Sequence, residues 1–168
     1  CRNILALRGD PPAGGEFQPT PGGFAYSAQL VKFIREQNGF NIGVAGFPEG
    51  HVACREGKHA DWEHLKEKVE AGADFVLTQL FFDNADYYRF VDDVRAAGVK
   101  ISIVPGLLPV LSTKQIRRIA GLCGAKIPDA LQQRLDAAGD DDAKAETVGV
   151  EWCAAQVKDL LAHGAPGI

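Results

Sequence analysis

The sequence predicts an α/β fold on a parallel sheet, as part of a (β/α)8 TIM barrel, from three observations. Short runs rich in Val, Ile, Leu and Phe alternate with segments of helical periodicity. The apolarity of each run is nearly continuous, as in strands covered on both faces. The first turn reads Arg8-Gly9-Asp10-Pro11-Pro12 and not G-x-G-x-x-G, which argues against the main alternative, an open doubly wound sheet.

Four strands are expected, at residues 4–7, 42–47, 75–82 and 101–104. The first helix should cover residues 24–37, because Leu30, Phe33 and Ile34 recur at helical spacing. The second should cover residues 61–71 and place its apolar side chains, Trp62, Leu65 and Val69, on one side. A strand followed each time by a helix requires parallel strands with crossover helices.

The third helix has the clearest signals. Asp83 or Asn84 can cap its start, and Gly98 supplies a left-handed stop. Its apolar residues follow the i, i+3, i+4, i+7 pattern: Tyr87, Phe90, Val91 and Val94.

Three further helical pieces follow the fourth strand. Ser112 caps a short helix that carries Ile116 and Ile119, and Pro128 opens another. The last helix runs from about 143 to 163 and ends at Gly164, with these side chains inward: Val150, Cys153, Val157, Leu160 and Leu161. A complete barrel needs about 250 residues. We therefore expect residues 1–168 to be one partial barrel domain, a fragment that starts inside a structural element.

Composition and charge exclude some classes of binding partner. The net charge is −4, and Lys and Arg are scattered among acids, so no basic stripe is available for nucleic acid. The apolar runs are too short to cross a bilayer and no signal peptide opens the chain, so we expect a cytoplasmic protein without a membrane partner. The four cysteines form no CxxC pair and are expected to be free thiols.

The strand ends are the expected ligand site, because parallel α/β folds bind ligands there. They are polar, with Asp10 after the first strand, residues 48–51 after the second, and Gln79 within the third. Asp10 before two prolines also fits a simple turn cap. Gln79, flanked by apolar side chains, needs a hydrogen-bond partner, which is either the backbone of a neighbouring strand or a heteroaromatic ligand.

Several motifs have competing interpretations. The linker from Pro11 to Gly23 is either a surface connection or a loop at the barrel mouth. Arg8-Gly9-Asp10 spells an adhesion tripeptide, which needs an exposed loop and here ends a strand that we expect to be buried. His51 and Cys54 lack a second ligand pair, so no metal is expected. Lys68 lies in a charged run that by itself predicts only a solvated helix face.

The strand ends together resemble the methylenetetrahydrofolate reductase family. Six segments carry the resemblance in order: Leu7-Arg8-Gly9-Asp10-Pro11, Val44-Ala45-Gly46-Phe47-Pro48-Glu49-Gly50-His51, His64-Leu65-Lys66-Glu67-Lys68-Val69, Gly72-Ala73-Asp74-Phe75, Thr78-Gln79-Leu80-Phe81-Phe82-Asp83 and Ile103-Val104-Pro105-Gly106-Leu107-Leu108-Pro109-Val110. The resemblance covers essentially the whole chain and implies the fourth to seventh strands of the barrel.

The resemblance implies an enzyme that contains FAD and reduces 5,10-methylenetetrahydrofolate to 5-methyltetrahydrofolate with NADH or NADPH, as a homo-oligomer when full length. It serves one-carbon metabolism and methionine supply. The family's general acid, a first-strand glutamate, has no counterpart in residues 1–168, nor does a substrate-binding arginine beyond the eighth strand. The fragment alone is therefore expected to be inactive.

The resemblance also assigns residues. Asp10 is the one catalytic residue, a charge beside the flavin that favours a cationic iminium form of the folate. For the folate it implies Asp10, Gln79 and Gln115. For the flavin it implies Arg8, Gly9, Asp10, Tyr26, Ser27, Ala45, Phe47, His51, Asp61, His64 and Lys68, with Lys68 facing the pyrophosphate. For Asp61, a helix cap is the competing role.

Overall fold

The computed structural model describes residues 1–11 and 17–168. The elements follow in the order β1 (Asn3–Ala6), α1 (Ser27–Glu36), β2 (Asn41–Gly46), α2 (Lys58–Glu70), β3 (Phe75–Leu80), α3 (Asn84–Ala96), β4 (Ser102–Gly106), α4 (Thr113–Cys123), α5 (Asp129–Ala138) and α6 (Asp142–Ala162). The expected alternation of strands and helices is confirmed. Part of the predicted 11–23 linker lies outside the described residues, and the rest contains no helix or strand.

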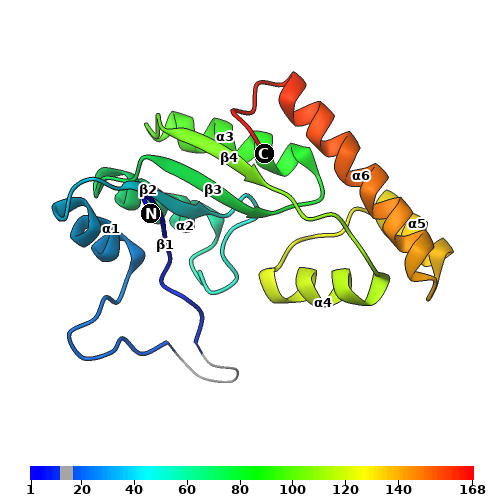
Figure 1. The fold of residues 1–168 in the computed structure, drawn as a ribbon, viewed down its shortest axis with the longest axis horizontal. Coiled ribbons are helices and arrows are strands. Elements are labelled where there is room, and N and C mark those ends of the chain that lie inside the picture. Colours follow the sequence, from blue (N-terminus) through cyan, green and yellow to red (C-terminus); the bar gives the residue numbers. More distant parts are fainter. Residues whose placement is uncertain (12–16) are drawn as a thin grey trace.

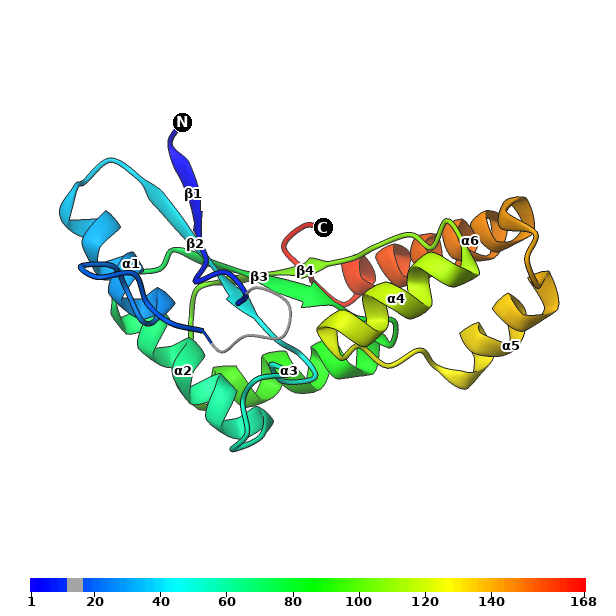
Figure 2. The same ribbon diagram turned by 90° about the horizontal axis from the view of Figure 1, so that it is seen from below.

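The four strands form one parallel sheet in the order β1-β2-β3-β4 (Figure 1). Each strand pairs with the next along the chain, in registers such as Ala6 with Val44 and Val44 with Val76. Right-handed crossovers that always step in the same direction put every helix on the same face. Helices α1, α2 and α3 do lie together on one side of the sheet (Figure 2). A doubly wound sheet reverses its strand order, and none of the four strands does so.

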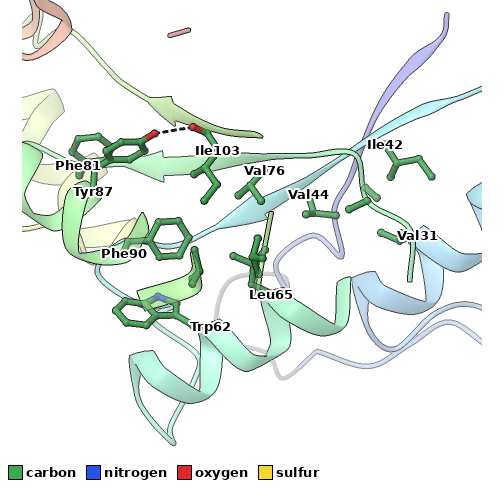
Figure 3. Packing of buried hydrophobic residues seen from close by; sticks show 14 of the residues in the cluster. Val31, Ile42, Val44, Trp62, Leu65, Val76, Phe81, Tyr87, Phe90 and Ile103 are labelled. Atoms are coloured by element: carbon green, nitrogen blue, oxygen red, sulfur yellow. Dashed lines mark hydrogen bonds between the residues drawn. The ribbon is translucent and has the colours of Figure 1, made fainter. Parts of the chain in front are cut away.

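The main core lies between the sheet and helices α1 to α3 (Figure 3). Alternate strand residues such as Ile42, Val44 and Val76 point to the helices, which contribute Leu65 and Phe90. Strand side chains on the opposite face, such as Leu5, which is 40% exposed, lack this cover. The strand β1, expected to be buried, has only Ala6 buried and ends before Leu7, because in this chain it is an edge strand.

A second core joins β3 to helices α4, α5 and α6, with Phe82, Ile116, Leu131, Leu135 and Ala145 buried in it. Strand β3 ends at Leu80, two residues earlier than predicted. Phe81 and Phe82 leave the sheet and pack into the first and the second core, respectively. Figure 1 shows α5 and α6 extending beyond the sheet beside α4.

The predicted helix signals are largely confirmed. The Asp83 side chain accepts from the Ala85 N–H at 2.9 Å, and the Ser112 hydroxyl accepts from the Gln115 N–H at 3.1 Å. Gly98 and Gly164 adopt positive φ where α3 and α6 end. Helix α2 begins at Lys58, three residues before Asp61, with Gly57 as N-cap. Asp61 therefore lies inside the first turn, and its alternative role as a cap is wrong.

The predicted inner face of the last helix is wrong in part. Val150 and Leu161 are about half exposed, and the buried positions of α6 include Gly149 and Gln156. A Cβ atom at Gly149 would lie 2.0 Å from the Val110 carbonyl oxygen, so the helix packs against backbone at this point. Phe33 is 48% exposed as well, and packs against Phe24 at 5.4 Å between ring centroids.

Candidate functional site

The carboxyl ends of β2 and β3 bring together some of the candidate residues, because parallel strands all end at one edge of the sheet. Two groups form there. The first contains Ala45, Phe47 and His51 from the end of β2, with Asp61 and Lys68 from α2. The second surrounds Gln79 at the end of β3.

Lys68 lies at the centre of the first group. Its side chain is buried, and Nζ donates to the Ala45 carbonyl oxygen at 2.7 Å and lies 5.9 Å from the Phe47 ring centroid. The prediction of a solvated helix face is therefore wrong for Lys68, whereas its neighbour Glu67 is exposed. The charged run hides this burial because Lys68 continues the buried α2 stripe of Asp61 and Leu65 at helical spacing, while the charged residues between them face outward or are half-buried.

Asp61 and Lys68 are both buried charges. Burial is the largest influence on each: it raises the pKa of Asp61 and lowers the pKa of Lys68. Their mutual attraction opposes both shifts, and the His51 backbone N–H further lowers the pKa of Asp61. The arrangement holds a carboxylate and an ammonium together out of water beside the end of β2, which is characteristic of a site for a charged ligand.

His51 has a defined tautomer. Its Nδ1 accepts a hydrogen bond from the Ala53 N–H at 3.0 Å, so the neutral ring carries its proton on Nε2. The ring packs edge-on against Phe47 at 4.5 Å between centroids. His51 therefore offers one hydrogen-bond donor, Nε2–H, next to the Lys68 cation.

His64 lies one turn before Lys68 on α2. It is exposed and its Nδ1 lies 3.4 Å from the Glu67 carboxylate, with which it forms an ion pair when protonated. Its charge contributes to lowering the pKa of Asp61. The structure thus places His64 at the rim of the first group.

Arg8, Gly9 and Asp10 follow β1. The Arg8 guanidinium lies 4.5 Å from the Phe17 ring centroid, and Asp10 is exposed. Gly9 has a φ of +78°, which a residue with a Cβ atom adopts only at a cost. In the described ranges, these three residues make no hydrogen bond or ion pair with the Lys68 group.

Tyr26 and Ser27 mark the start of α1. Tyr26 is 65% exposed, and its backbone N–H donates to Gln29 Oε1 at 3.2 Å. Ser27 is half-buried as the first helical residue. Both positions are fixed by the helix start, and the phenol ring of Tyr26 is accessible.

Gln79 finds a local hydrogen-bond partner. Its Oε1 accepts from the Leu80 N–H at 2.9 Å, because the β3–β4 register shifts between Leu77 and Leu80. The sequence predicted either a neighbouring strand's backbone or a ligand as the partner, whereas the observed partner is the N–H of the next residue in the same strand. Gln115 lies on the first turn of α4 and is exposed, with its backbone N–H capped by Ser112.

Glu49 is a site residue to which the sequence reasoning assigned no role. It follows β2, and both of its carboxylate oxygens accept from the Lys126 N–H, at 3.1 and 3.2 Å. Burial raises the pKa of Glu49. It lines a small cavity together with Gln79. The signal in the sequence was an acidic residue at a strand end, within Pro48-Glu49-Gly50-His51.

Across residues 1–11 and 17–168, no three His, Cys, Asp or Glu side chains cluster as metal ligands do. In the same ranges, no helix is both long and apolar enough to cross a membrane. The four cysteines are free.

A one-directional parallel sheet with buried charges and amides at its strand ends defines an α/β protein of the class that binds ligands at that edge. The family model "Methylenetetrahydrofolate reductase" matches residues 1–168. The chain therefore belongs to the methylenetetrahydrofolate reductase family.

Two relatives illustrate the match. The chain is 41% identical to "Methylenetetrahydrofolate reductase (NADH) 1" of Arabidopsis thaliana, over 97% of this chain and 29% of the relative. It is 38% identical to "5,10-methylenetetrahydrofolate reductase" of Escherichia coli, over 97% of this chain and 53% of the relative. The chain thus spans between about a quarter and a half of the length of these curated relatives.

A solved structure has a similar fold. It is an uncharacterized protein from Clostridium thermocellum, described as binding two copies of 5-methyl-5,6,7,8-tetrahydrofolic acid. It superposes with a TM-score of 0.58 and 19% identity over 94% of this chain and 57% of that chain. At this identity the likeness supports the fold alone.

Proposed function

We propose that the full-length protein reduces 5,10-methylenetetrahydrofolate to 5-methyltetrahydrofolate with FAD and a nicotinamide nucleotide, NADH or NADPH. Family membership over the whole chain supports this reaction. The observation that carries it is the buried Lys68 ammonium beside Asp61 at the end of β2, where a parallel sheet binds its ligand.

We further propose that the sheet is one part of a (β/α)8 barrel, its fourth to seventh strands. The one-directional strand order and the placement of α1 to α3 on one face support this, because a barrel keeps both features all the way round. The uncovered opposite face, with Leu5 and Leu7 exposed, would then be the barrel interior. The longer relatives have the additional length that the other strands require.

The first group of site residues fits FAD. Lys68 uses one of its three N–H donors on Ala45, which leaves two for a phosphate oxygen, and His51 adds Nε2–H. Bound there, FAD would accept hydride from the nicotinamide and deliver it to the folate. The remaining flavin contacts proposed are Arg8, Gly9, Asp10, Tyr26, Ser27, Ala45, Phe47, Asp61 and His64.

The folate contacts proposed are Asp10, Gln79 and Gln115. An amide offers both a donor and an acceptor, which matches the adjacent donors and acceptors of a pterin ring. Because Gln79 Oε1 already accepts a hydrogen bond from the Leu80 N–H, we propose that the Nε2 amide group of Gln79 donates to the ligand. The Asp10 carboxylate favours a cationic folate by electrostatics. The proton donor lies outside residues 1–168 in this proposal, and the chain alone is inactive.

The full-length polypeptide tests this function. We expect a yellow protein whose flavin absorbance is bleached by NADH or NADPH and restored by 5,10-methylenetetrahydrofolate, with 5-methyltetrahydrofolate as product. A colourless protein, or one whose reduced flavin is not reoxidised by the folate, would contradict the proposal. Residues 1–168 alone should not turn over under the same conditions.

A further inference from the structure

Two segments 77 residues apart meet above the ends of β2 and β3. The Glu49 carboxylate, after β2, accepts from the Lys126 N–H through both of its oxygens. Val52 packs beside Gly124, where a Cβ atom would lie 2.5 Å from the Val52 side chain. We call residues 123–126, which leave α4 at this contact, the roof segment. In both ribbon views the end of α4 lies beside the chain that leaves β2 (Figure 1 and Figure 2).

The roof segment covers Gln79 from one side. Beneath it is a cavity of about 10 Å³, whose lining includes Glu49, Gln79, Cys123 and Ala125. A cavity of this size holds roughly one water molecule. No ring system fits under the roof segment, so Glu49 does not contact a ligand from within this cavity. What Glu49 does there is hold the roof segment in place.

Helix α4 is thereby fixed at both ends. Its first turn, with Gln115, follows β4, while the roof segment directly after its last turn is tied to the chain beyond β2 through Glu49 and Lys126. An 11-residue helix spans about 16 Å, so the tie at one end sets the position of side chains at the other. Glu49 therefore controls where Gln115 stands relative to Gln79.

Partial burial of the Glu49 carboxylate costs free energy. Its carboxylate is half-buried, and its hydrogen-bond partner in the described part of the chain is one backbone N–H. Nearby Asp83 and Asp86 repel its charge, while the Lys126 charge opposes them. The hydrogen bond from the Lys126 N–H offsets part of this cost and holds the carboxylate against the roof segment.

We propose that Glu49 is a positioning residue for folate: it ties the roof segment to β2 and so sets the spacing of the amides Gln79 and Gln115. This proposal rests on the proposed function. It predicts that loss of the tie weakens folate binding and leaves flavin reduction by the nicotinamide nucleotide unchanged, since Glu49 does not belong to the Lys68 group.

The test compares variants of the full-length enzyme. Glu49→Ala should raise the KM for 5,10-methylenetetrahydrofolate roughly ten-fold, the loss expected for one charge-assisted hydrogen bond, with wild-type flavin content and a wild-type rate of flavin reduction. Glu49→Gln should restore most of the affinity, because its amide oxygen accepts the same N–H. Glu63→Ala, exposed on α2, is the matched control and should leave the KM unchanged.

A second pair of variants approaches the contact from the other side. Lys126→Pro removes the donor N–H and should reproduce the KM of Glu49→Ala, whereas Lys126→Ala keeps the N–H and should resemble wild type. Combining Glu49→Ala with Lys126→Pro should add no further loss, as expected for partners of one contact.

Three outcomes would overturn the proposal: an unchanged folate KM in Glu49→Ala, equal impairment of Glu49→Gln and Glu49→Ala, or loss of flavin reduction together with the KM effect. Failure of the proposed function is a separate result, because wild-type enzyme would then show no folate-dependent reoxidation of its flavin.

Discussion

The Nζ atom of Lys68 donates to the carbonyl oxygen of Ala45 at 2.7 Å. Ala45 lies one residue beyond the last pair of the β1–β2 ladder, Ala6 with Val44. The ammonium group thus lies next to β2 just beyond the residues that pair with β1. A cation is held at the end of the sheet by a neutral acceptor, and two of its N–H donors remain for an anionic ligand.

Replacing Lys68 should weaken the binding of FAD. In the full-length protein, Lys68→Met is expected to raise the Kd for FAD at least roughly ten-fold, because a charge-assisted bond to phosphate is lost. Fluorescence titration of the apoprotein with FAD measures this. The control is Lys66→Met, because Lys66 is half-buried two residues away on a different side of the same helix; this variant should bind FAD like wild type. Wild-type affinity in Lys68→Met would show that Lys68 does not face the cofactor.

Gly106 should not tolerate a side chain. A Cβ atom there would lie 2.2 Å from the Thr78 carbonyl oxygen, where β3 and β4 shift register. Gly106→Ala is expected to lower the free energy of unfolding by about 1–3 kcal/mol, measured by urea denaturation of the full-length protein.

The control for this prediction is Gly121→Ala. Gly121 lies in α4 with open space around the Cβ position, so alanine should stabilise the helix by about 1 kcal/mol. Opposite signs for the two substitutions are expected. Equal effects would mean that the close approach at Gly106 is relieved without cost.

The sequence predicted elements whose signals are local. Asp83 and Ser112 cap their helices because a short polar side chain reaches the N–H groups two or three residues on, whatever surrounds the helix. The inner face of α6 depends on tertiary contacts instead. Gly149 is buried against the Val110 backbone, and Gln156 donates to the Phe81 carbonyl at 3.2 Å, so hydrophobic periodicity selected the wrong residues.

The candidate site was predictable to a similar extent. Strand ends identified where polar residues such as Gln79 gather, because parallel strands share one edge. The charged run around Lys68 gave no sign that this side chain is buried. Only the family resemblance assigned Lys68 a role in the site. The role of Glu49 depends on Lys126, 77 residues away, and no local pattern predicts such a contact.

The Tyr88 hydroxyl should make stability depend on pH in the alkaline range. It donates to Asp159 Oδ2 at 2.6 Å, and burial followed by this bond raises the pKa of Tyr88 to about 12. The folded pKa exceeds the unfolded one, so this stabilisation is full below about pH 10 and is lost as the pH rises through about 12. Thermal unfolding between these values should show a steeper decline for wild type than for Tyr88→Phe. Parallel curves would contradict the assignment.

The contribution of Glu49 to stability should also decrease as the pH rises, in this case across the acidic range. Burial raises its pKa above the ordinary value of 4.5, so its contribution is most favourable below that value and declines as the pH rises through the folded pKa. Glu49→Gln removes the titration. The Tm of Glu49→Gln minus that of wild type should therefore increase from pH 4 to pH 7, whereas Glu63→Gln should show no such trend. A constant difference would mean that Glu49 is not strained by burial.

Asp10 tests the electrostatic part of the proposed reaction. A carboxylate beside the flavin disfavours added electron density on the ring, so Asp10→Asn in the full-length enzyme should raise the reduction potential. A change of about 1.4 kcal/mol corresponds to about 30 mV in a two-electron couple, and a rise of this order is expected. Folate reduction should slow, because the same substitution removes the charge that favours a cationic folate.

The control is Asp92→Asn, exposed on α3, which should leave both quantities unchanged. Asp10 is exposed and follows Gly9, whose positive φ sets the turn after β1, so the substitution should not unfold the protein. Redox titration and stopped-flow reoxidation separate the two effects. An unchanged potential together with slow folate reduction would place Asp10 at the folate alone, and wild-type behaviour in both would remove it from the site.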